Sequence, residues 1–442
     1  ARDRAAKRCK DLGLRCEVWG CTDLDARVQQ HPDLIRTFFG WQPPSPSGVP
    51  FQAPPLPAYF IPRSEVSNEL KSQLLADDAA TPGTLVISAV HGLGGIGKTT
   101  LVAHLTYDSD IQERFPDGIL WATLGQQPDM LSLLSGWIQA LGDYDFHPTT
   151  TEMVSPHLRT LLHDKACLLV VDDAWQTDHA RAFLVGGERC RVLMTTRDAS
   201  LARKLGARLY DLDVMTEEQA LDLFEARLGP LDGHREQAAA LAGELGYLPL
   251  ALELAAAQAE SGVPWRELLQ AFRQGLANLA ALDLDEASYR NESMRLSFDL
   301  SLERLSDDDR KAFAWLGVLP EDAILNPAMG ATLWIVPEME AHKRLRRLRD
   351  KALVKFAGNG QYTLHDLLRD EAKLRLTKLM PLREAHISLL ARYQEIVPAG
   401  RWDELPDDGY IHEQLSWHME QAGQIEAIHA LLHMDTDDGR NG

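Results

Sequence analysis

Short apolar runs alternate with stretches of helical apolar spacing between residues 59 and 215. Each run is short enough to form one strand, and the stretches between the runs have the spacing of amphipathic helices. A buried parallel sheet with helices on both faces produces this pattern. The predicted strands are 85–90, 119–123, 167–171, 191–195 and 208–212. We therefore expect an α/β domain with a parallel sheet flanked by helices over residues 59–215.

The pattern becomes helical from Thr216 onward. Thr216 and Gln219 have the spacing of a capping box, so a helix is expected to begin there. Glycine and proline separate four predicted helices, which are 216–228, 234–245, 249–260 and 264–274. We assign residues 216–290 to a helical domain.

A hairpin follows several short helices in the next part of the chain. Residues 353–356 and 361–364 read as two strands around the turn Gly358-Asn359-Gly360, and a helix is expected over 365–377. This order favours a winged-helix domain over residues 291–380. Residues 381–442 read as a further helical segment.

The first residues of the chain have a different character. Residues 1–42 read as one strand and two helices, which cannot form a sheet layer alone, so we expect the C-terminal remnant of an upstream domain. Eight of the 23 prolines fall within residues 43–62, which predicts a stiff linker over 43–58. The chain begins with Ala1 and shows no signal peptide, so we read it as a piece of a longer protein.

Composition narrows the class of protein. Of the 442 residues 45% are apolar and 25% are charged, which is ordinary for soluble domains, and no apolar run is long enough to span a membrane. The charge sum is 45 − 65 = −20, which disfavours coating of nucleic acid by bulk charge. No CxxC pair occurs among the five cysteines, which indicates a reducing, cytoplasmic location. We expect buried thiols at Cys9, Cys16 and Cys21 rather than a metal site.

A phosphate-binding loop is the strongest chemical signal. Residues 92–99 read Gly-Leu-Gly-Gly-Ile-Gly-Lys-Thr and match G-x-x-x-x-G-K-S/T at every position, between a predicted strand and a helix. Glycine lets backbone amides wrap a phosphate, and the helix N-terminus adds positive potential. Lys98 is expected to reach the β- and γ-phosphates, and the Thr99 hydroxyl to bind Mg²⁺. The expected nucleotide-contacting residues of this segment are Gly92, Gly94, Gly95, Ile96, Gly97, Lys98, Thr99 and Thr100.

Two carboxylates and an arginine supply the remaining chemistry. Asp172 and Asp173 follow the apolar run 167–171, and we expect Asp172 to hold Mg²⁺ and Asp173 to polarise an attacking water. Arg197 ends the next strand, where it can contact the γ-phosphate. The alternative for Arg197 is a surface arginine paired with Asp198.

These motifs together resemble the signal-transduction ATPases with numerous domains (STAND) in their NB-ARC branch, over about residues 59–380. Four further motifs carry the resemblance in the family's order. They are Ile61-Pro62-Arg63, Thr195-Thr196-Arg197-Asp198, Gly246-Tyr247-Leu248-Pro249-Leu250-Ala251 and Leu364-His365-Asp366. The third has Tyr247 inserted before Leu248, and the fourth has Leu364 where the family has methionine.

The resemblance implies roles for single residues. Ile61 and Arg63 would lie against the adenine, and Pro249 would pack on the edge of the base. His365 would reach the β-phosphate of ADP. A capping or core role is the alternative for His365, and a first-turn helix proline is a compatible role for Pro249.

The resemblance also implies a function. The protein would be an ATP/ADP switch with Mg²⁺ that is closed with ADP, oligomerises with ATP, hydrolyses slowly and activates an N-terminal effector, as in prokaryotic defence. Residues 1–42 resemble the end of a restriction-endonuclease-like effector, which would be the route to nucleic acid, or else are a structural adaptor. Residues 408–418 resemble the join to a C-terminal sensor for a trigger, which would lie past Gly442.

Two alternatives remain open. A STAND-class transcription regulator would read DNA with the helix before the hairpin, which carries Lys343, Arg344, Arg346, Arg347, Arg349 and Lys351. The same residues also fit a solvated face around buried Leu345 and Leu348. An ordinary P-loop kinase or ATPase would instead need an acceptor site or fast turnover.

Overall fold

The computed structural model describes residues 49–57, 59–76, 86–91, 94–146, 148, 150–280, 286–321, 323–397 and 401–432. The expectations for residues 1–42, for residues 43–48 and 58 of the proline linker, and for Gly92 lie outside these ranges, as do those for Cys9, Cys16 and Cys21. The chain divides into two compact units, which we describe separately. The sheet unit contains residues 49–55, Asn68–Val90 and Val102–Tyr210. The helical unit contains Leu56–Ser67, His91–Leu101 and the chain from Asp211 onward.

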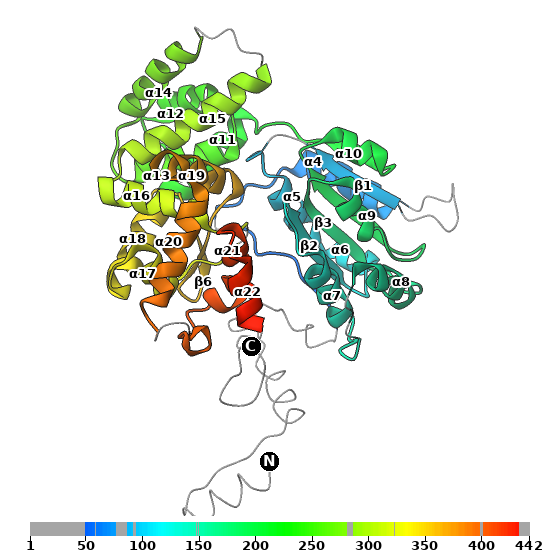
Figure 1. The fold of residues 1–442 in the computed structure, drawn as a ribbon. Coiled ribbons are helices and arrows are strands. Elements are labelled where there is room, and N and C mark those ends of the chain that lie inside the picture. Colours follow the sequence, from blue (N-terminus) through cyan, green and yellow to red (C-terminus); the bar gives the residue numbers. More distant parts are fainter. Residues whose placement is uncertain are drawn as a thin grey trace, which may run out of the picture. The chain divides into compact units, whose positions relative to one another are not determined.

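The sheet unit is built around a five-stranded sheet with the order β2-β3-β4-β1-β5, of which β1, β2 and β3 are labelled in Figure 1. The strands are β1 (Val86–His91), β2 (Ile119–Gly125), β3 (Leu168–Ala174), β4 (Arg191–Thr196) and β5 (Arg208–Asp211). β2 pairs with β3 and β3 pairs with β4, both in parallel, which confirms the predicted parallel sheet. The helices associated with these strands are α4 (Ser64–Leu75), α5 (Lys98–Thr106), α6 (Ser109–Arg114), α7 (Met130–Ala140), α8 (Thr151–Leu162), α9 (Thr177–Ala182) and α10 (Ala199–Lys204).

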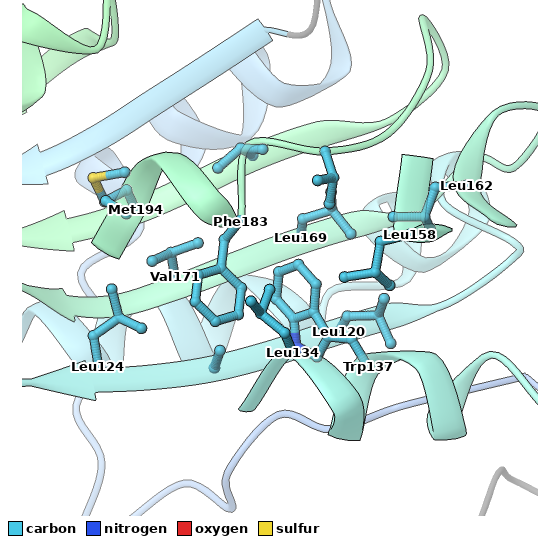
Figure 2. Packing of buried hydrophobic residues seen from close by; sticks show 14 of the residues in the cluster. Leu120, Leu124, Leu134, Trp137, Leu158, Leu162, Leu169, Val171, Phe183 and Met194 are labelled. Atoms are coloured by element: carbon cyan, nitrogen blue, oxygen red, sulfur yellow. The ribbon is translucent and has the colours of Figure 1, made fainter. Parts of the chain in front are cut away.

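Strand β3, which lies between β2 and β4, is buried along its whole length. Figure 2 shows its apolar side chains Leu169 and Val171 among residues from the neighbouring strands and from α7 and α8. The rings of Trp137 and Phe183 meet edge to face with centroids 4.9 Å apart. This packing holds β3 in place up to its C-terminal end, where Asp172 and Asp173 carry the two candidate carboxylates. Cys167 and Cys190, just before β3 and β4, are buried and are not joined in a disulfide.

The helical unit begins its long helical run as predicted. Thr216 and Gln219 form a capping box, and the run comprises α11 (Glu217–Leu228), α12 (Arg235–Glu244), α13 (Pro249–Glu260), α14 (Trp265–Ala280) and α15 (Glu286–Glu303). The predicted end of α14 at residue 274 was too early. Gly275 lies within α14, where a Cβ would approach the Leu296 side chain of α15 to 2.4 Å. The glycine therefore allows close approach of two helices.

The hairpin and the helices around it follow in the expected order. They are α16 (Asp307–Trp315), a 3₁₀ turn (Leu316–Val318), α17 (Pro327–Trp334), α18 (Glu338–Asp350), the antiparallel pair β6 (Lys355–Gly358) and β7 (Gln361–Thr363), and α19 (Asp366–Leu379). Leu325 bridges Tyr362 of β7 and so extends the small sheet. The last elements are α20 (Leu382–Gln394), a 3₁₀ turn (Trp402–Glu404), α21 (Ile411–Gln421) and α22 (Ile425–Leu432). Within the described ranges, no helix combines the length and apolar character needed to cross a membrane.

Candidate functional site

The glycine-rich loop before α5 adopts backbone conformations that favour glycine. Gly95 has φ +75° and Gly97 has φ +95°, both in the left-handed region. The first helical hydrogen bond runs from the Leu101 amide to the Gly97 carbonyl, at 2.9 Å. The loop therefore ends on a helix N-terminus, where several amides have no helical partner and can face an anion.

Gly95 is surrounded by three helices of the helical unit. A Cβ at this position would lie 3.2 Å from Met294 Cε of α15, and 3.3 Å from both Leu250 Cβ of α13 and Leu367 Cδ1 of α19. These distances leave no room for a larger residue without movement of a neighbour. The loop is thus in direct contact with the helix that follows the β6–β7 hairpin.

Arg63 holds the same loop from another side. Its side chain is buried, and its guanidinium donates to the Ile96 carbonyl at 2.9 Å and to the Asp213 carbonyl at 2.8 Å. Both bonds have a charged donor, which makes them stronger than neutral ones. Arg63 therefore fixes the loop backbone as well as lying at the pocket described next. The Ile96 side chain is itself buried, so this residue presents its backbone to the loop.

A mostly apolar pocket adjoins the loop. Residues of the loop, of α5, of α13 and of the segment before α4 all contribute to its walls. Its lining residues are Pro57, Tyr59, Phe60, Ile61, Arg63, Gly97, Thr100, Leu101, Met215, Leu223, Pro249 and Glu253. Of the residues expected to meet a base, Ile61, Arg63 and Pro249 all line it. Apolar walls beside a phosphate-type loop suit a flat heterocycle joined to phosphates.

Pro249 occupies the first turn of α13, which is the structural role that the sequence analysis gave it beside contact with a base. Glu253 lies one helical turn later on the same face, and both line the pocket. Sequence reasoning missed Glu253. The i,i+4 spacing from Pro249 was the signal that could have found it.

Lys98 and Thr99 begin α5 and differ in exposure. Lys98 is 7% exposed, whereas Thr99 is exposed. Thr100, the next residue, lines the pocket. Mg²⁺ prefers oxygen ligands and usually keeps several waters or phosphate oxygens. The hydroxyl of Thr99 and the carboxylate of Asp172 are both groups of this kind. Among the residues that the structure describes, no group of three or more His, Cys, Asp or Glu forms a metal site of its own.

His365 is the N-cap residue of α19. Its Nδ1 accepts a hydrogen bond from the Leu367 amide at 3.2 Å, so the capping role considered from the sequence is present. An Nδ1 that accepts leaves the proton of a neutral imidazole on Nε2. The cap therefore accounts for the Nδ1 side of the ring.

Asp172 and Asp173 lie at the end of β3 in the sheet unit and share one threonine. The Thr195 hydroxyl donates to Asp172 Oδ1 at 2.6 Å and accepts from the Asp173 amide at 2.8 Å. Asp172 is 2% exposed, and Asp173 has φ +48°, which is uncommon for a residue other than glycine. The threonine therefore positions both acidic residues.

Asp173 also belongs to a cluster with Trp175 and Arg197. The Trp175 indole donates to Asp173 Oδ2 at 2.7 Å, and Arg197 Nε lies 3.5 Å from Asp173 Oδ1. The Arg197 guanidinium carbon lies 4.9 Å from the centroid of the Trp175 ring, a cation–π distance. Asp198 instead caps α10 through the Ser200 amide. Neither Trp175 nor the linking role of Thr195 was anticipated, because both depend on the pairing of β3 with β4.

Comparison with known proteins gives a family and a fold. Residues 63–232 match the NB-ARC domain family. The chain is 31% identical over 331 residues to the regulatory protein AfsR of Streptomyces coelicolor. This matched region covers 72% of this chain and 32% of AfsR. The chain is 26% identical over 400 residues to the human apoptotic protease-activating factor 1, covering 86% of this chain and 31% of that protein. The chain thus spans about a third of the length of these relatives.

A solved structure supports the same fold. The STAND protein PH0952 from Pyrococcus horikoshii, which has a tetratricopeptide repeat sensor, superposes with a TM-score of 0.53 at 15% identity. The match covers 86% of this chain and 50% of that protein. At this level of sequence identity, the structural similarity indicates a shared fold and nothing about function.

Proposed function

Because the chain belongs to the NB-ARC branch of the STAND-class P-loop NTPases, we propose that it is an ATP/ADP-driven signalling switch. The observation that carries the proposal is the packing of Gly95 against Leu250, Met294 and Leu367. A loop with the sequence of a phosphate-binding loop lies against helices from three parts of the helical unit. Whatever occupies the loop can therefore affect how those helices pack.

The nucleotide would be held through two regions of the helical unit. The base would enter the pocket lined by Ile61 and Pro249, and the phosphates would meet the loop amides, Lys98 and Thr99. Mg²⁺ would be held by Thr99 and Asp172 and would neutralise phosphate charge. His365 would reach the β-phosphate, as the resemblance of residues 364–366 to the family's motif implies.

Hydrolysis would depend on the acidic cluster of the sheet unit. Asp173 would orient the attacking water, and Arg197 would contact the γ-phosphate. Both side chains are held by Trp175, so they are already oriented before a ligand arrives. We expect hydrolysis to be slow and to reset the switch.

The two nucleotides would favour different arrangements of the chain. ADP would stabilise the packing seen around Gly95, and the γ-phosphate of ATP would favour an open arrangement that associates with further copies. A ligand shifts such an equilibrium only through its different affinity for the two states. We assign the parts of this switch to residues 59–215, 216–290 and 291–380, the last as a winged helix, with an effector upstream and a trigger sensor downstream.

We also propose a role in defence or regulation, and the kinds of protein among the relatives support it. Their names include a regulatory protein, an apoptotic protease-activating factor and a disease resistance protein. DNA reading by α18 is less favoured. Arg347 pairs with Asp309 and Glu340, and Arg349 pairs with Asp350, so part of the basic charge of α18 is already neutralised within the protein.

Mass measurement under each nucleotide tests the proposal. Light scattering of the Asp173→Asn variant, which should retain ATP, is expected to give a monomer with ADP and a larger assembly with ATP. Lys98→Ala is the control and should stay monomeric in both. Equal masses with ADP and ATP, together with rapid turnover by the unmodified protein, would favour an ordinary ATPase.

A further inference from the structure

Glu253 is the single carboxylate among the residues that line the described pocket. It projects from the same face of α13 as Pro249, one turn further along the helix. Its side chain is 21% exposed, so it is largely covered by the protein. A carboxylate in an otherwise mostly apolar wall needs a partner, because burial of an uncompensated charge is costly.

Lys355 supplies that partner. Its ammonium nitrogen lies 3.2 Å from Glu253 Oε2. Lys355 begins strand β6 and is paired with Thr363 of β7, two residues before His365. The pocket wall is therefore joined to the hairpin that leads directly into α19.

The backbone of Glu253 is fixed as well. Arg227 of α11 donates to the Glu253 carbonyl at 3.1 Å and to Glu260 Oε2 at 3.0 Å. The same guanidinium lies 5.7 Å from the centroid of the Tyr59 ring, another wall of the pocket. Both ends of the Glu253 residue are thus held, and its carboxylate has a defined place in the pocket.

A carboxylate accepts hydrogen bonds and donates none. Lys355 engages Oε2, which leaves acceptor capacity on Oε1. Arg63, the cationic residue among those that line the described pocket, donates to the carbonyls of Ile96 and Asp213. The pocket therefore presents a negative acceptor to the edge of an entering base, and an amino group on that edge is its natural complement.

We propose that Glu253 selects the base by accepting a hydrogen bond from the exocyclic amino group of adenine, with Lys355 as the positioning residue that keeps the carboxylate oriented. The inference rests on the proposed function, which puts adenine in this pocket. It adds a consequence for the switch: because Glu253 contacts both base and hairpin, filling of the base pocket strengthens the attachment of the β6–β7 hairpin to α13.

Affinities for two nucleotides test the selection. The ligands are ADP and purine riboside 5′-diphosphate, which lacks only the amino group, each measured by displacement of a fluorescent ADP from nucleotide-free protein. The unmodified protein should prefer ADP by about ten- to hundredfold, the usual effect of one hydrogen bond to a charged group. Glu253→Leu should bring the ratio close to one. Lys355→Met should lower it about threefold, and should have no further effect in the Glu253→Leu background.

Matched controls separate selection from structural damage. Glu267→Leu removes a carboxylate paired with Arg304 outside the pocket lining, and Lys351→Met removes the lysine four residues before Lys355 in the chain. Neither change should alter the ratio. If Glu253→Leu does not fold, Glu253→Gln serves instead. Its amide adds a donor, so it should raise the affinity for inosine diphosphate, which has an oxygen in place of the amino group, relative to ADP.

The outcomes distinguish this inference from the proposed function. An unchanged ADP preference in Glu253→Leu or Glu253→Gln overturns the base-selecting role, while ADP binding that Lys98→Ala abolishes would leave the switch intact. Absence of ADP binding by the unmodified protein overturns both. If Glu253→Leu lowered the affinities for both ligands by the same factor, the Glu253–Lys355 pair would have only a structural role. That result would also overturn the inference.

Discussion

The Arg63 guanidinium donates to the Ile96 carbonyl at 2.9 Å, so a residue just before α4 holds the backbone of the glycine-rich loop. A second bond to the Asp213 carbonyl joins the segment before α11 to the same side chain. Three segments distant in sequence are thus held by one buried cation. Arg63 therefore stabilises the fold in addition to lining the pocket.

Replacement of Arg63 by methionine should weaken both the fold and nucleotide binding. The change removes two charge-assisted hydrogen bonds and leaves the Ile96 and Asp213 carbonyls without this donor, a loss of about 3 kcal/mol in the free energy of unfolding. ADP affinity should fall at least about tenfold, because the loop backbone is no longer fixed. Chemical denaturation and ADP titration measure the two effects. Arg266→Met, at an exposed arginine on α14, is the control, and equal behaviour of the two variants would contradict this role.

The two left-handed glycines should respond differently to alanine. Gly97→Ala meets only atoms at 3.9 Å or more, so its cost is backbone strain, about 1–2 kcal/mol. Gly95→Ala adds contacts at 3.2–3.3 Å with Met294, Leu250 and Leu367. It should therefore loosen the packing of α19 on the loop and speed ADP release more than Gly97→Ala does. Stopped-flow release of a fluorescent ADP compares the variants, and faster release from Gly97→Ala would contradict the packing argument.

Thr195 should be required for the acidic pair. Thr195→Val keeps the shape but removes the donor to Asp172 and the acceptor for the Asp173 amide, both of which are buried. The expected loss is about 1–3 kcal/mol in unfolding free energy, with a clear drop in ATP hydrolysis. Thr195→Ser keeps the hydroxyl and is the matched control. Unfolding curves and phosphate release that do not separate valine from serine would exclude the linking role.

A buried histidine pair should make the segment 382–421 sensitive to acid. The Nδ1 atoms of His386 and His418 lie 2.9 Å apart, so one ring donates and the other accepts. The Tyr410 hydroxyl lies 2.6 Å from His418 Nε2 and its pKa is raised by burial, which keeps it protonated. Burial lowers the pKa of His386 to about 4, with the charge of Lys373 adding to the effect. Burial lowers the pKa of His418 to about 3, with His386 adding to it.

The sign of this effect follows from the lowered pKa values. Because both histidines bind protons more weakly in the folded protein than at the unfolded value of about 6.5, stability is complete above that pH and falls as the pH drops through it. His418 alone should cost about 2 kcal/mol at pH 5. Denaturation at pH 7 and pH 5 measures the difference, which the double variant His386→Leu, His418→Leu should reduce. His429→Leu, at an exposed histidine, should leave it unchanged; a double variant with the full pH dependence would contradict the assignment.

Local chemistry made much of the fold predictable. The strand bounds follow from short apolar runs, the start of α11 from the Thr216–Gln219 capping box, and the loop from its glycines and Lys98. The partners of these groups were not predictable, because they are set by tertiary packing. Trp175 meets Arg197 only when β3 lies beside β4, and the close approach of Leu296 to Gly275 of α14 depends on how α15 packs. His365 illustrates what local sequence cannot decide. The same residue fits a helix cap, which the structure contains, and the ligand contact that we propose.

The central claim is that the chain is a switch that retains ADP at the loop of residues 94–99. The most direct measurement is to denature the purified protein and identify the released nucleotide by chromatography, with Lys98→Ala beside it. The account predicts about one ADP per chain from the unmodified protein and none from the variant. No released nucleotide, together with fast steady turnover of added ATP, would contradict it.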